Sequence, residues 1–188
     1  VASGRRRAIL ARPNGSVRSL AFSPDGRTLA AGGWYRLDLW DVPSFALRAS
    51  YSLPSSVLRI AFSPAGAALA ATVDSTVTLW DLGRAGRLRL GGHDGQGGGV
   101  VAAVSPDGRR IISGDEEGCL RTWDAATGAL LLPAESLPAP VRALAFDPDG
   151  MRLLVGLGDG TVRVRDLATG GWTATFSGYG GATSRSVV

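Results

Sequence analysis

Histidine and cysteine limit the chemistry of this sequence most sharply, because each occurs once, as His93 and Cys119. The pair could form a thiolate–imidazole dyad, and His93 could also join a serine and an aspartate in a Ser–His–Asp arrangement. One histidine and one cysteine, with no CxxC motif, fall short of the ligand set of a structural zinc site. Both residues also fit positions in the repeat described below. We therefore expect no catalytic residue, no metal and no cofactor.

A glycine-rich segment, GGHDGQGGG at residues 91–99, could be mistaken for a phosphate-binding loop. It lacks the Gly-Lys-Ser/Thr ending of such loops, and it leads into a predicted strand instead of a helix. We therefore interpret residues 91–99 as a long loop.

All 20 basic residues of the chain are arginine, which excludes every mechanism that needs a lysine. The net charge of +4 is spread along the chain, so nucleic acid is an unlikely partner.

The strongest pattern in the chain is a fourfold repeat. Four prolines are separated by 40, 42 and 42 residues, and four aspartates by 40, 43 and 42 residues. These landmarks are Pro24, Pro64, Pro106 and Pro148, and Asp41, Asp81, Asp124 and Asp166. A unit of this length cannot bury its apolar surface alone, so the units are expected to stack on one another.

Each unit is predicted to contain four short antiparallel strands, named a to d from the inside outwards. Segments such as VRSLAF and TVTLW alternate apolar and polar residues, and turns such as Ser23–Gly26 combine Pro, Asp and Gly. No segment of ten or more residues shows helical spacing. The predicted units span about 17–52, 57–90, 100–132 and 141–177, in a single domain covering 1–188, with an additional outer strand at about 5–11.

Trp-Asp pairs end strand c in three units, a Gly-His pair precedes the third unit, and Ser-Pro-Asp-Gly turns recur. The pairs are Trp40-Asp41, Trp80-Asp81, Trp123-Asp124 and Gly92-His93. With these residues the chain resembles the WD-repeat β-propeller family, in a divergent bacterial-type form, although Arg165 stands where the fourth Trp is expected. The resemblance implies an all-β propeller of four-stranded antiparallel blades, four of them present. Since the family usually closes with six to eight blades, we expect either a larger propeller or closure by self-association.

The resemblance also implies a structural hydrogen-bonded set in the third unit. In the family this set joins a His before strand a, a Ser or Thr on strand b, the Trp of strand c and an acid in the b–c turn. The matching residues here are His93, Ser113 and Trp123, with Glu117 as the acid six residues before the Trp. We expect the other units to pack without such a set.

The d–a and b–c loops of the family lie on one rim, which usually binds partners. In the first unit this rim carries Trp34-Tyr35-Arg36, residue types that are enriched at interface hot spots. The alternative is that Trp34 packs against a neighbouring blade. The predicted partner-binding rim consists of Trp34, Tyr35, Arg36, Asp74, Asp94, Glu116 and Asp159.

The resemblance therefore implies a non-catalytic scaffold, not an enzyme, that binds another protein through its rim. One alternative is nucleic-acid binding through Arg18, Arg59 and Arg142 near strand a. Another is a structural or regulatory appendage of a signalling enzyme. No apolar run approaches the ~18 residues of a membrane span, and the single cysteine and missing export signal favour the cytoplasm.

Overall fold

The structure is a computed structural model that describes residues 8–10, 16–82, 86–91, 93 and 99–177. These residues form sixteen strands and no helix, and the strands make four four-stranded sheets. None of the described segments is a helix that has the length and apolar character needed to cross a bilayer. The predicted all-β class and the four antiparallel blades are confirmed.

The blades follow one another along the chain, and each uses its strands in sequence order. Blade one contains β1 (Val17–Phe22), β2 (Thr28–Gly33), β3 (Arg36–Asp41) and β4 (Leu47–Ser52). Blade two contains β5 (Val57–Phe62), β6 (Ala68–Val73), β7 (Thr76–Asp81) and β8 (Gly86–Leu90). Blade three contains β9 (Val101–Val104), β10 (Arg110–Gly114), β11 (Cys119–Asp124) and β12 (Glu135–Ser136). Blade four contains β13 (Val141–Phe146), β14 (Arg152–Leu157), β15 (Thr161–Asp166) and β16 (Trp172–Ser177).

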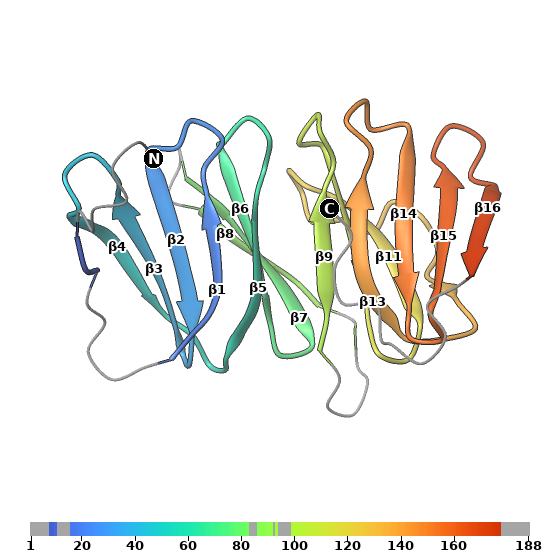
Figure 1. Cartoon of the computed structure of the whole chain (residues 1–188), viewed down its shortest axis with the longest axis horizontal. Coiled ribbons are helices and arrows are strands. Elements are labelled where there is room, and N and C mark those ends of the chain that lie inside the picture. Colours follow the sequence, from blue (N-terminus) through green and yellow to red (C-terminus); the bar gives the residue numbers. More distant parts are fainter. Residues whose placement is uncertain (1–7, 11–15, 83–85, 92, 94–98, 178–188) are drawn as a thin grey trace.

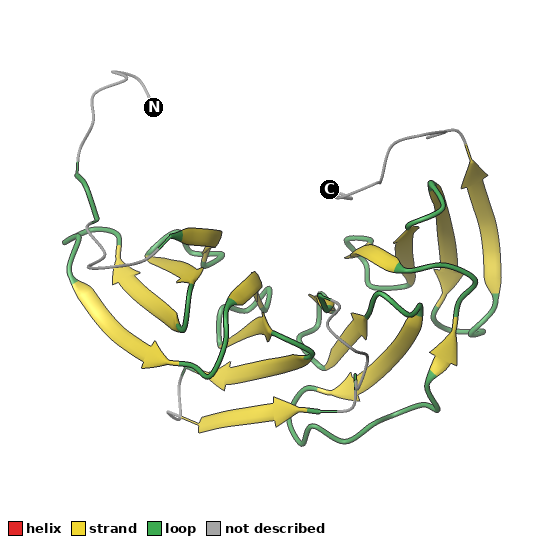
Figure 2. Ribbon diagram, turned by 90° about the horizontal axis from the view of Figure 1, so that it is seen from below, coloured by secondary structure: helices red, strands yellow, loops and turns green. Residues whose placement is uncertain are grey.

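The four sheets stand side by side in an open arc, as Figure 1 and Figure 2 show from two directions. The first strands of neighbouring blades, β1, β5, β9 and β13, lie next to one another along the inside of this arc. The third blade differs from the expectation at its outer edge, because β12 covers only Glu135–Ser136 instead of ending near residue 132. Of the additional strand expected at 5–11, only residues 8–10 are described, and they are not in a strand.

Apolar packing between blades forms the core, with one buried cluster at each of the three seams. Two glycines allow the closest approach of one blade to the next. A Cβ on Gly32 would lie 2.4 Å from Val57 of blade two, and a Cβ on Gly114 would lie 2.5 Å from Val141 of blade four. A larger residue at either glycine would therefore push the neighbouring blade away.

In blades one, two and four, the first strand begins with a register irregularity at a position that belongs to the site described below. The pairing shifts between Val17 and Ser19, between Val57 and Arg59, and between Val141 and Ala143. Each shift leaves one residue without a partner in the ladder, and such a bulge re-aims its side chain away from the usual alternation. The residues six positions before the four repeat prolines, three of which lie at these shifts, are Arg18, Leu58, Val100 and Arg142.

Candidate functional site

A buried chain of hydrogen bonds links strand b, strand c and the loop before strand a in blade three. Trp123 Nε1 donates to Ser113 Oγ at 2.8 Å, and Ser113 Oγ lies 2.6 Å from His93 Nε2. His93 Nδ1 lies 2.8 Å from Asp115 Oδ2. Because a carboxylate only accepts, Nδ1 carries the proton, and Ser113 can then accept from Trp123 while it donates to His93. All four side chains are buried, so each polar group depends on this chain for a partner.

The acid of this set is Asp115, so the prediction that Glu117 is the acid bonded to His93 is wrong. Asp115 Oδ1 accepts the backbone N–H groups of Glu117 at 3.0 Å and of Cys119 at 2.8 Å, while Oδ2 faces His93. The Glu117 side chain is exposed. Asp115 leaves strand b at the start of the turn, where its short side chain reaches both the turn amides and the histidine.

The geometry of His93 and Cys119 is unfavourable for the catalytic arrangements considered from the sequence. Both ring nitrogens of His93 are already hydrogen-bonded, to Asp115 and to Ser113. Burial raises the pKa of the Cys119 thiol, which disfavours the thiolate that nucleophilic chemistry needs. One ligand atom from each of His93, Asp115 and Cys119 lies within 4.8 Å of the others, but a metal would have to break the His93–Asp115 bond. The arrangement is that of a structural brace.

The aromatic pair on the rim of blade one is exposed. Trp34 is 51 % and Tyr35 57 % accessible, and their rings meet edge to face with centroids 6.3 Å apart. The Arg18 guanidinium lies over the Trp34 ring, 5.2 Å from its centroid, in a cation–π contact. Tyr35 has a φ of 55°, in the left-handed region, which fixes the turn that presents both rings. The structure therefore places Trp34 at the surface and not between blades.

Arg36, the third member of that predicted triplet, has a structural partner. Its Nε donates to Asp38 Oδ1 at 2.8 Å, and Ser50 Oγ donates to the same oxygen at 2.6 Å. Asp38 is only 1 % exposed, so Arg36 compensates a buried carboxylate. The sequence analysis missed Asp38, although an acid between two leucines in RLDLWD was a visible signal.

Of the remaining predicted rim residues, two lie in b–c turns, one forms an ion pair, and one is outside the described part of the chain. Asp74 is exposed in the b–c turn of blade two, with a φ of 55°. Asp159 accepts hydrogen bonds from the Thr161 hydroxyl and backbone N–H, and the hydroxyl bond is the main cause that lowers the pKa of Asp159. Glu116 pairs with Arg142 at 2.6 Å. Asp94 lies outside the described residues.

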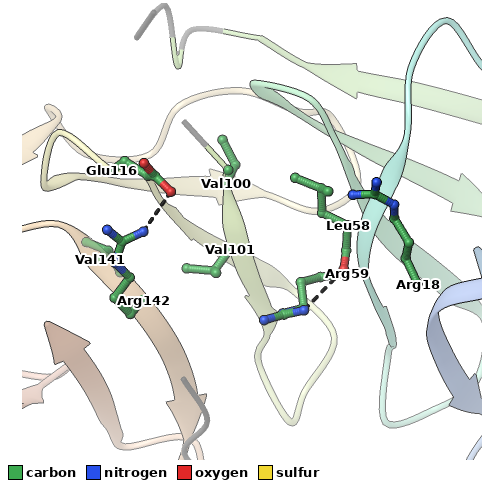
Figure 3. A pocket seen from close by; sticks show the side chains of 9 residues that line it. Arg18, Leu58, Arg59, Val100, Val101, Glu116, Val141 and Arg142 are labelled. Atoms are coloured by element: carbon green, nitrogen blue, oxygen red, sulfur yellow. Dashed lines mark hydrogen bonds and ion pairs between the residues drawn. The ribbon is translucent and has the colours of Figure 1, made fainter. Parts of the chain in front are cut away.

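A pocket of about 450 Å³ opens where the inner strands begin, on the same rim, and we call it the axial pocket. Figure 3 shows the Glu116–Arg142 pair on one side of Val100 and Val101, and Arg18, Leu58 and Arg59 on the other. Its lining consists of Arg18, Leu58, Arg59, Gly99, Val100, Val101, Glu116, Val141 and Arg142. The three arginines considered above for nucleic acid thus meet in one cavity.

Comparison with known proteins identifies the family. The model of the WD domain, G-beta repeat, matches residues 4–41, 47–81, 87–124 and 133–166. The chain belongs to this family. A chain in a crystal structure of a mitotic checkpoint complex superposes on 94 % of this WD-repeat chain with a TM-score of 0.81, at 23 % identity. That likeness shows the fold alone, and the aligned part is 56 % of the other chain. No curated protein matches the sequence.

The fourth WD repeat replaces the expected Trp with Arg165 and builds a polar seam at that point. Arg165 Nη1 bonds to Glu135 Oε2 on β12 of the preceding blade, and Trp172 Nε1 donates to Glu135 Oε1 at 2.9 Å. The guanidinium groups of Arg163 and Arg165 lie 4.6 and 5.6 Å from the Trp172 ring centroid. One carboxylate therefore ties blade three to blade four.

Proposed function

We propose that this WD-repeat chain is a non-catalytic interaction platform that binds a protein partner through the rim carrying Trp34, Tyr35 and the axial pocket. The observation that supports it most is the exposure of two large aromatic rings in a turn with defined geometry. Aromatic side chains bury much area on binding at little entropic loss, and a rigid turn lowers that loss further. Arg18 connects the aromatic pair to the axial pocket, so one partner can contact both.

Site-specific photocrosslinking tests this proposal. The photoreactive amino acid p-benzoylphenylalanine is introduced at Trp34 or, as a control, at Met151, which is 52 % exposed in the a–b turn on the opposite rim. We expect a defined protein adduct from position 34 and none from position 151. Equal labelling from the two positions, or no adduct from position 34, would contradict rim binding.

A second measurement separates binding from folding. Arg36→Ala is unsuitable for this purpose, because it would remove the guanidinium that pairs with the buried Asp38 carboxylate. The double variant Trp34→Ala/Tyr35→Gly removes both rings, and glycine suits the positive φ of the turn. We expect it to keep its thermal unfolding midpoint and, with the photoreactive residue at Glu116, to lose the adduct that the unchanged rim forms.

We also propose that the free flank of blade one is covered by another WD blade, from a larger propeller or a second copy. Val17 is 48 % exposed, whereas its counterparts Val57 and Val141 are buried against the preceding blade at 0 % and 1 %. Light scattering at increasing concentration distinguishes the two. A dimer supports closure by a second copy, and a persistent 19.4 kDa monomer excludes it.

A further inference from the structure

The axial pocket combines charge and apolar surface in a way that specifies a ligand. Four of its lining residues, Arg18, Leu58, Val100 and Arg142, come from the same position of the repeat, one from each blade. In three blades the residue lies at the shift in register described above. A side chain at a bulge is released from the strict alternation of the strand. The four blades thus contribute one side chain each to a shared cavity.

The positive charge in this pocket exceeds the negative charge. Arg142 is paired with Glu116, the one acid among the described residues of the lining. Among the described residues Arg59 donates only to the Leu58 carbonyl oxygen, at 3.3 Å, and Arg18 contacts the Trp34 ring. Neither has a carboxylate partner within the described part of the chain. Among the described residues, nothing therefore compensates the charge of these two guanidinium groups, and Arg groups bind carboxylates strongly.

Apolar side chains lie between the ion pair and the two other arginines of the lining. In Figure 3, Val100 and Val101 are in the middle, Leu58 is beside Arg18 and Arg59, and Val141 is beside Arg142. A ligand that fits must offer an apolar group beside an anion. Because Glu116 is already paired with Arg142, the cations that remain for an anionic group of the ligand are Arg18 and Arg59.

We propose that the axial pocket binds an acidic segment of the protein partner, with an aspartate or glutamate carboxylate at Arg18 and Arg59. An adjacent aliphatic side chain of that segment lies against Leu58 and the valines. This inference rests on the proposed rim function and names the chemistry of its partner. Because both cations line an open cavity, the interaction weakens as salt is added.

Fluorescence anisotropy with a labelled peptide of alternating Asp and Leu residues tests the inference on the full chain. The double variant Arg18→Gln/Arg59→Gln is expected to bind at least about tenfold more weakly, since it loses two hydrogen bonds to a charged group. The matched control Arg27→Gln/Arg109→Gln removes two exposed arginines from the a–b turns of the opposite rim and should bind like the unchanged chain. Thermal unfolding of both variants verifies that they are folded.

Further probes decide the ligand class. An Asn-Leu peptide of the same length should bind at least about tenfold more weakly than the Asp-Leu peptide. Equal binding of the two peptides, equal binding by the Arg18/Arg59 variant, or tighter binding of a phosphoserine peptide or oligothymidine would overturn the inference. If photocrosslinking from position 34 succeeds while the Asp-Leu peptide does not bind, only this inference fails. If the peptide binds and crosslinking fails, the pocket's preference for an acidic ligand stands, but the rim function fails and with it the assignment of that ligand to a rim-bound protein partner.

Discussion

Blades two and three have a tryptophan at the same position of strand c, but they differ in the hydrogen bonding of its indole N–H. Trp80 pairs across the sheet with Leu69, as Trp123 does with Ile111. In blade three the indole N–H donates to Ser113. In blade two the corresponding strand-b residue is Ala71, and Trp80 Nε1 is buried with no hydrogen-bond partner among the described residues.

Aromatic packing takes the place of the missing polar set in blade two. The Tyr51 ring, from β4 of the preceding blade, lies 5.8 Å from the Trp80 ring, centroid to centroid. Such a contact contributes roughly 0.5–1.5 kcal/mol beyond the area it buries, whereas an orphaned buried donor costs about 1–3 kcal/mol. Blade two is thus stabilised by packing, although the Trp80 N–H has no partner among the described residues, and blade three is stabilised by a hydrogen-bonded network.

The largest expected effect comes from removing the acid of blade three. Asp115→Ala would leave His93 Nδ1 and the backbone N–H groups of Glu117 and Cys119 without their acceptor. We expect the free energy of unfolding to fall by about 3 kcal/mol. Urea denaturation followed by tryptophan fluorescence measures this. Glu117→Ala is the matched control and should change stability by less than about 0.5 kcal/mol. Similar losses in the two variants would show that Asp115 is not the acid of the set.

Exchanging the strand-b residue between the blades tests the comparison directly. Ser113→Ala removes the partner of both Trp123 and His93, and should lower the free energy of unfolding by about 2 kcal/mol. Ala71→Ser offers Trp80 an acceptor and should raise it by up to about 1 kcal/mol. Urea denaturation curves of the two variants measure both changes in the free energy of unfolding. Opposite signs support the comparison, and a destabilising Ala71→Ser would show that blade two has no room for the hydroxyl.

Shortening each tryptophan to phenylalanine separates packing from hydrogen bonding. Both Trp80→Phe and Trp123→Phe lose ring volume, but only the second breaks a hydrogen bond, while the first removes an unpaired donor. We expect Trp80→Phe to be less destabilising by about 1 kcal/mol. Differential scanning calorimetry of the two variants provides the comparison. Equal losses would indicate that Trp80 Nε1 has a partner after all.

The smallest expected effect concerns the a–b turns, where blade three has Asp107 and blade two has Ala65. A hydrogen bond from Ser105 is the main cause that lowers the pKa of Asp107. A carboxylate whose pKa is lowered by folding adds stability above its unfolded pKa, and this stability is lost as the pH falls through the folded value. Ala65→Asp, beside Ser63, should therefore raise the unfolding midpoint slightly at neutral pH. The gain should fade below about pH 4, and a gain that persists in acid would exclude this cause.

Much of the fold could be predicted because the same turn and strand-end residues recur at regular intervals in the sequence. Prolines, turn glycines and Trp-Asp pairs indicated the period, and the alternation within each unit predicted the strands of the four blades except the outer strand of blade three, β12. The polar set was predictable in three of its members, His93, Ser113 and Trp123. Its acid was missed because counting back from Trp123 assumes one turn geometry, whereas the direction of a side chain in a turn depends on local hydrogen bonds.

The binding surface was less predictable, because it depends on which strands face each other. Arg36 was grouped with its aromatic neighbours, but cross-strand register brings Ser50 opposite Asp38 and makes Arg36 the partner of that buried acid. Arg18, Arg59 and Arg142 were noted as basic residues near strand a. That they line a single cavity follows from the stacking of blades, which has no local signature.

The bulge at the start of the inner strands has an evolutionary consequence. A residue outside the ladder can change without disturbing the backbone pairing of its sheet, so positions 18, 58 and 142 are free to vary independently of that pairing. Duplicated blades that begin with identical linings can thereby diverge one substitution at a time. A few residue types at these three sites would then generate many distinct selectivities on one unchanged scaffold.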